Sequence, residues 1–253
     1  MIPTAVDGLI WLLVCLLPFL LIQRVLHREM QALFLILTRS PALAVGLFSF
    51  LFFPGVLLHE SSHFLMAKLL RVPTGRFSLT PQLLPNGVLR LGYLETKQVD
   101  PLREALVGVA PLITGGLVVA LLGAFRLGLM PLAAAVSLGD WPAAWRIFLL
   151  LPEQADFWIW FYLALSISST MLPSASDRQS WLPVILVLAV LTGVAIAAGA
   201  GPWMLTNLAP RLNNALRAVA LVFAISLAPH LVVAIPVTLL RLLLSRITGL
   251  EPT

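Results

Sequence analysis

The stretch FFPGVLLHESSHFLMAKLL, residues 52–70, is the most informative part of this chain. It is almost entirely apolar, yet His59, Glu60 and His63 fall within five consecutive positions of it. Residues four apart lie on one face of a helix, so the two imidazoles would project to the same side. An ionisable side chain at the centre of a membrane helix costs about 2.5–3.5 kcal/mol on insertion scales, so three of them together indicate a functional site.

The composition of the whole chain predicts a protein that faces lipid. Of its 253 residues 60% are hydrophobic and only 11% are charged, and the mean hydropathy is +0.99. A soluble domain is nearer half apolar and a quarter charged. The alternation of a β-barrel is missing, so we expect helices to satisfy the backbone within the lipid bilayer. The net charge of +5 is spread over the connecting segments and gives no reason to expect nucleic acid as a partner.

Six apolar stretches approach the length of about 20 residues with which a helix crosses a bilayer. They cover residues 9–22, 41–70, 106–125, 157–172, 182–198 and 215–244, and Pro54-Gly55 predicts a kink in the second. We therefore expect an all-α polytopic membrane protein with about six transmembrane helices in one integral membrane domain, residues 1–253. The first stretch lacks a basic leader, so we expect a retained helix, as is typical of a prokaryotic cytoplasmic (inner) membrane protein.

The longest polar segment, residues 72–100, follows the stretch that contains the histidines. Residues 76–79 and 88–94 have the composition of short strands, and Pro85-Asn86-Gly87 between them is a turn signal. The sequence therefore predicts a small β-hairpin directly after the helix that carries His59 and His63.

The His59-Glu60-Ser61-Ser62-His63 spacing is typical of a helical zinc site. The two histidines can hold one ion, and Zn²⁺ lowers the pKa of a bound water to about 7. Glu60 is then placed to accept a proton from that water instead of binding the ion. We expect one Zn²⁺, held in part by His59 and His63, with Glu60 as the catalytic base.

A catalytic zinc site needs a third protein ligand and an open position. The turn between the fourth and fifth expected helices returns to the side of the membrane on which the stretch 52–70 ends, which favours Asp177. Glu104, at the start of the third expected helix, is the alternative on the same side. His230 lies deep in the last apolar stretch between two prolines, where we expect a hydrogen-bonded core histidine.

Four features in this order resemble the site-2 protease family of intramembrane zinc metalloproteases, over roughly residues 50–180. They are His59-Glu60-x-x-His63 in a membrane helix, a strand-rich loop with the step Gly92-Tyr93, Gly108-x-x-Pro111 at the start of the next helix, and Pro173 followed by Asp177 between two later helices.

The resemblance implies a zinc-dependent endopeptidase that cleaves a membrane-protein substrate in or near its transmembrane helix. It implies His59, His63 and Asp177 as metal ligands and Glu60 as general base, within a protease-like core of about residues 41–200. The loop 72–100 would pair with an unwound segment of the substrate, because strand addition satisfies backbone groups. Residues of this loop and of the next helix are the substrate-binding candidates, namely Gly92, Tyr93, Gly108 and Pro111.

The chain departs from the family pattern at several positions. Ser61 and Ser62 stand where Leu-Gly or a similar pair is usual, Thr170 stands where Asn is expected, and Arg178 replaces Gly. The spacing from Pro173 to Asp177 is one residue shorter than usual, and Arg178 could instead form an ion pair with Asp177 in a plain turn.

Two other classes of protein are compatible with the sequence. One is a non-proteolytic structural or chaperone-like membrane subunit that retains the metalloprotease fold, which the altered Asp177 motif favours and Glu60 disfavours. The other is a transporter, which would suit helices interrupted by Pro and Gly but leaves the HExxH segment unexplained. For the protease, substrate delivery would fall to the loops or to membrane partner subunits.

Overall fold

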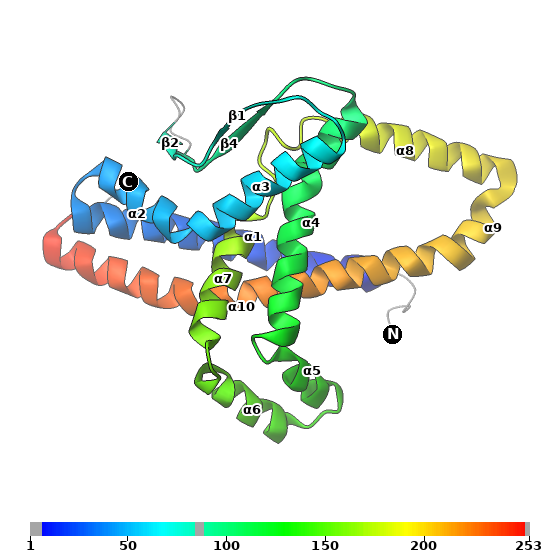
Figure 1. Cartoon of the computed structure of the whole chain (residues 1–253). Coiled ribbons are helices and arrows are strands. Elements are labelled where there is room, and N and C mark those ends of the chain that lie inside the picture. The colour runs from blue at the N-terminus through cyan, green and yellow to red at the C-terminus, as the bar shows by residue number, and fades with distance from the viewer. Residues whose placement is uncertain (1–6, 84–88, 251–253) are drawn as a thin grey trace.

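The structure is a computed structural model that describes residues 7–83 and 89–250 (Figure 1). About 80% of it is helical, with a small antiparallel sheet, so the expected fold class is confirmed in outline. The predicted turn Pro85-Asn86-Gly87 lies outside the described residues.

The first and last long helices, α1 (Asp7–Thr38) and α10 (Ala209–Thr248), lie side by side and run in the same direction (Figure 1). An ion pair joins Asp7 to Arg217 near their beginnings, and another joins Glu29 to Arg241 at 2.7 Å near their ends. α1 continues through residues 23–38, beyond the apolar stretch 9–22, and its Gln23, Leu26 and Glu29 are buried in the fold.

The stretch 52–70 does not form one long helix with the residues before it. α2 (Pro41–Leu51) and α3 (Phe53–Leu69) meet at Phe52 with a bend of 70°, directly before Pro54. The predicted kink is therefore confirmed and is a sharp break. The Gly55 amide donates to Ser166 Oγ at 3.0 Å, and a side-chain carbon at position 55 would collide with the Ser166 carbonyl. Gly55 thus lets α3 lie directly against α7.

The helix α7 (Phe157–Thr170) is the centre of the core. It packs against α3, against α4 (Pro101–Phe125) and against α10. Two apolar clusters meet on it, one around Phe48, Phe52 and Leu165 and one around Phe19 and Ile167. Between α4 and α7 the chain forms α5 (Leu129–Ser137), α6 (Trp141–Leu150) and the short 3₁₀ turn η1 (Leu151–Glu153).

The segment after α7 extends away from the core. α8 (Trp181–Ala195) has no buried residue and is followed by η2 (Ile196–Ala200), α9 (Gly201–Trp203) and η3 (Met204–Leu208). Gly199 has φ +90°, a left-handed conformation that glycine adopts at low cost. This residue interrupts the helical path, so that the chain turns back toward α10 (Figure 1).

The expectation of six transmembrane helices is wrong. Three helical stretches of the described chain are long and apolar enough to cross a bilayer, Asp7–Thr38, Pro101–Phe125 and Trp181–Thr248, and a fourth exists if the bent pair α2–α3 is one span. The fourth expected span, α7, has only 14 residues, and the fifth and sixth are continuous apart from the break at Gly199. The parallel course of α1 and α10 is a second disagreement, because six alternating spans would make the first and last antiparallel.

The loop after α3 contains the expected antiparallel strands. β1 (Thr74–Ser78) pairs with β4 (Tyr93–Thr96), with Ser78 opposite Tyr93, and β2 (Gln82–Leu83) pairs with β3 (Leu89–Arg90). The second expected strand is therefore divided into β3 and β4. This hairpin covers the end of α3 that carries the histidines (Figure 1).

Candidate metal centre

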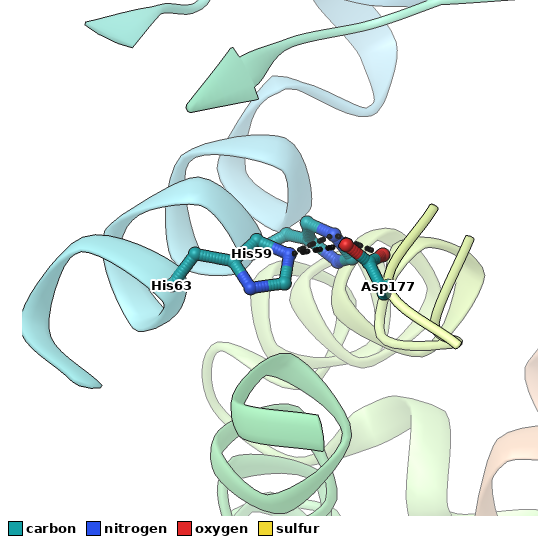
Figure 2. A group of neighbouring side chains, drawn as sticks. All are labelled: His59, His63 and Asp177. Carbon is teal, nitrogen blue, oxygen red and sulfur yellow. Dashed lines mark hydrogen bonds and ion pairs between the residues drawn. The ribbon is translucent and has the colours of Figure 1, made fainter. Parts of the chain in front are cut away.

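The side chains of His59, His63 and Asp177 converge on one point (Figure 2). His59 and His63 come from successive turns of α3, and Asp177 comes from the loop between α7 and α8. The two Nε2 atoms are 3.1 Å apart, and they lie 3.8 Å and 3.3 Å respectively from the Asp177 carboxylate oxygens. One ligand atom from each residue falls within 4.8 Å of the others. The three residues predicted as metal ligands are thus brought together.

The outer nitrogen of each imidazole is held by a backbone carbonyl. His59 Nδ1 lies 2.6 Å from the Thr170 carbonyl oxygen, and His63 Nδ1 lies 2.8 Å from that of Val107. A carbonyl oxygen can only accept, so both Nδ1 atoms carry a proton, and in the neutral ring each Nε2 then presents a lone pair. Two lone pairs that face each other at 3.1 Å repel unless a proton or a cation lies between them. Metal-binding histidines in proteins are oriented in this way.

Two of the three separations are close to those around a tetrahedral zinc ion. Two nitrogen ligands at about 2.0–2.1 Å from Zn²⁺ are about 3.3–3.4 Å apart in tetrahedral geometry. The Nε2–Nε2 distance of 3.1 Å and the His63–Asp177 distance of 3.3 Å are close to this value, and the His59–Asp177 distance of 3.8 Å is longer. Two imidazoles and one carboxylate form a borderline ligand set that suits Zn²⁺ and leaves one position open.

Asp177 is positioned by its own loop and by α4. The Ser174 amide donates to Asp177 Oδ2 at 2.7 Å, and a side-chain carbon on Gly108 would collide with the Asp177 carbonyl oxygen. Burial acts to raise the pKa of Asp177, but the hydrogen bond and charge that His63 supplies when both of its nitrogens are protonated, together with the hydrogen bonds from Ser174, outweigh it and lower the pKa to about 2. Asp177 is therefore a carboxylate at neutral pH.

Glu60 lies beside the three ligands and is not one of them. Its side chain is 93% buried, and it lines a cavity of about 810 Å³ together with His59, His63 and Asp177. The strand residues Arg90, Gly92 and Tyr93 line the same cavity. A side-chain carbon on Gly92 would come within 2.9 Å of Glu60 Cγ, so the absence of a side chain there lets the backbone before β4 approach Glu60 closely.

The other candidate ligands are engaged elsewhere. Glu104 accepts from the Val99 amide at 3.1 Å and from the Ser180 hydroxyl, so it joins the start of α4 to the α7–α8 loop. His230 is fully buried and hydrogen-bonded to Ser169 and to the Ser226 carbonyl, in agreement with the expectation of a core histidine.

The alternative ion pair between Arg178 and Asp177 is not formed in the described chain. Arg178 Nε donates to the Ser174 carbonyl at 3.2 Å, while Asp177 faces the histidines.

Sequence reasoning missed the groups that support the ligands. Thr170 and Val107 act through backbone carbonyls, which no side-chain pattern reveals. Ser174 could have been found, because a serine three residues before an aspartate commonly forms a local hydrogen-bonded turn. Ser62, one of the departures from the family pattern, lies 2.5 Å from Thr114 Oγ1 and ties α3 to α4.

Comparison of the chain with protein-family models, with curated proteins and with solved structures finds no match.

Proposed function

We propose that this protein is an intramembrane zinc metalloprotease of the site-2 protease type, embedded in a prokaryotic cytoplasmic membrane. The observation that carries the proposal is the convergence of two histidine lone pairs and one carboxylate beside Glu60 in an open cavity. A site that only stabilised the fold would have no use for the open cavity or for the free carboxylate next to the ligands.

His59, His63 and Asp177 would hold Zn²⁺, which when bound supplies a Lewis acid and lowers the pKa of water to about 7. Glu60 is the general base in this proposal: it accepts a proton from the attacking water and returns it to the leaving amine. The charge of Asp177 and the two Nδ1 hydrogen bonds keep the ligands fixed during that transfer.

The substrate would be an unwound segment of a membrane protein. β4 lines the cavity and, in the described part of the loop, pairs on one side only, with β1. Its other edge offers unpaired backbone groups, so a substrate strand could add there and place a peptide bond over Glu60. This arrangement gives Gly92 and Tyr93 a role in substrate binding.

The test uses the full-length protein in detergent and a panel of single-span reporter proteins. We expect about one zinc per chain and cleavage of at least one reporter by the natural protein. Glu60→Gln should keep the zinc and lose cleavage by a factor of 10² or more, because it removes only the proton acceptor. Glu153→Gln, an exposed glutamate far from the cavity, is the matched control and should cleave normally.

Two results would overturn the proposal. If the purified protein binds no zinc, the metal site is wrong. If Glu60→Gln supports full cellular function, the protein is a structural or chaperone-like subunit, not a protease.

A further inference from the structure

The carbonyl that orients His63 belongs to an unusual turn of α4. Pro111 is the eleventh residue of this helix, which begins at Pro101, and it is fully buried. In an α-helix the amide of residue 111 would donate to the carbonyl of residue 107. Proline has no amide hydrogen, and its ring pushes the carbonyl four residues earlier away from the helix axis. The carbonyl of Val107 is therefore left without its helical donor.

His63 occupies the acceptor that Pro111 leaves free. Its Nδ1 lies 2.8 Å from the Val107 oxygen. His59 uses an equivalent acceptor at the end of α7, because Thr170 is the last residue of that helix and the last four carbonyls of a helix have no helical donor. Each histidine thus binds a carbonyl that receives no hydrogen bond within the helix to which the carbonyl belongs. The Val107 carbonyl is freed by a proline, and the Thr170 carbonyl is freed by a helix end.

We infer that Pro111 is a positioning residue of the metal centre, which acts by freeing the Val107 carbonyl to hold His63 with Nδ1 protonated and Nε2 directed at His59 and Asp177. Any other residue at position 111 would bring an amide hydrogen that competes for the same oxygen and draws it back toward the helix axis. The inference rests on the proposed metal site, but it concerns the tautomer of His63, which exists without metal.

The same turn of α4 also receives the third ligand. Gly108 follows Val107 directly and contacts the backbone of Asp177. The turn at residues 107–111 therefore contacts two of the three candidate ligands, His63 through the Val107 carbonyl and Asp177 through the missing side chain of Gly108. The sequence suggested substrate binding for this segment, and the geometry adds a role in building the site.

The decisive measurement is the ring ¹⁵N spectrum of histidine-labelled, metal-free protein at alkaline pH, where its four histidines are neutral. A His63→Gln spectrum assigns the signal of His63. We expect His63 to be the Nδ1–H tautomer in the natural protein and a mixture with the Nε2–H tautomer in Pro111→Ala. His59 is the internal control, because its acceptor lies on α7, and its tautomer should not change.

Zinc affinity gives the second readout. Loss of a hydrogen-bond partner behind a metal-binding histidine lowers metal affinity about 10- to 100-fold, and we expect this loss in Pro111→Ala. Pro111→Val restores most of the ring's volume while keeping the new amide hydrogen, so it should show the same loss. Pro236→Ala removes an exposed proline inside α10 and should bind zinc normally.

The outcomes separate the alternatives. An unchanged His63 tautomer in both Pro111 variants overturns the inference, and so does a loss of affinity in Pro111→Ala that Pro111→Val restores, because that pattern indicates packing. A natural protein that binds no zinc contradicts the proposed function, while the tautomer comparison still decides the role of Pro111.

Discussion

The four histidines of this chain form two pairs with very different surroundings. His59 and His63 lie on one helix, point at each other and at Asp177, and border an open cavity. His27 and His230 come from different helices, α1 and α10; His230 is fully buried, and His27 is partly buried against Phe48 and Phe52. His59, His63 and His230 lie in strongly apolar stretches of sequence and His27 lies beyond one, so hydropathy alone does not distinguish the pairs.

The pairs differ in what their ring nitrogens meet. Both nitrogens of His230 are used, by Ser169 and by the Ser226 carbonyl, and its ring contacts Phe19. His27 packs against Phe48 and Phe52, and its Nε2 has no hydrogen-bond partner among the described residues. Free lone pairs, a nearby carboxylate and access from outside together suit a metal ion, and only the first pair combines the three.

The largest expected effect separates the pairs by metal content. His63→Ala removes a ligand, and we expect zinc in the purified protein to fall from about one per chain to near zero. His230→Ala should retain the zinc but lower the free energy of unfolding by about 2–4 kcal/mol, because it opens a cavity and leaves Ser169 without its partner. Zinc analysis and thermal unfolding in detergent measure both. Zinc retained in His63→Ala would remove the distinction between the pairs.

A smaller effect is expected for Asp177, whose carboxylate lies beside His59 and His63. Asp177→Asn should weaken zinc binding by more than the roughly 100-fold that loss of a supporting hydrogen bond costs. Arg178→Ala changes the neighbouring residue, which binds Ser174, and should leave zinc affinity unchanged.

The pH dependence of the Asp177 effect follows from the lowered pKa of that carboxyl. A group whose pKa falls from 3.8 to about 2 on folding stabilises the folded state above pH 3.8 and loses this contribution as the pH falls through about 2. The stability that the metal-free natural protein has over Asp177→Asn should therefore persist as the pH falls to about 4 and be lost below it. A stability difference that already declines between about pH 6 and 5 contradicts an ionised Asp177.

The smallest expected effect concerns His230, a member of the second pair. Ser169→Ala removes the hydroxyl that binds His230 Nε2 at 2.9 Å. We expect a loss of about 0.5–1.5 kcal/mol in the free energy of unfolding, the net value of one hydrogen bond. Zinc content should not change, although Ser169 is next to Thr170, because Thr170 binds His59 through its backbone. A marked loss of zinc would show that the two pairs are coupled.

The sequence was sufficient for the parts of the site that depend on helical spacing and on simple topology. The four-residue interval placed His59 and His63 on one face, and the expected side of the α7–α8 turn led to Asp177 over Glu104. The hairpin was predicted from its turn residues and strand composition, and β1 and β4 form it.

The parts of the fold and of the site that the sequence did not predict depend on where apolar helices bend and on hydrogen bonds made by backbone groups. The kink at Pro54-Gly55 was predicted, but its angle of 70° was not, and hydropathy does not distinguish a fifth and sixth span from one path turned at Gly199. The count of six followed from this limitation. The carbonyls of Val107 and Thr170 are common to every residue type, so their role became visible only in three dimensions.

The shortness of the two helices that meet at the metal centre has a consequence for the surrounding membrane. α3 has 17 residues and α7 has 14, which at 1.5 Å per residue are about 25 Å and 21 Å long. A typical hydrocarbon layer is about 30 Å thick, and a bilayer adapts to shorter helices by becoming thinner around them. In a bilayer this protein would therefore create a local depression in the lipid, and water would have a shorter path to Glu60.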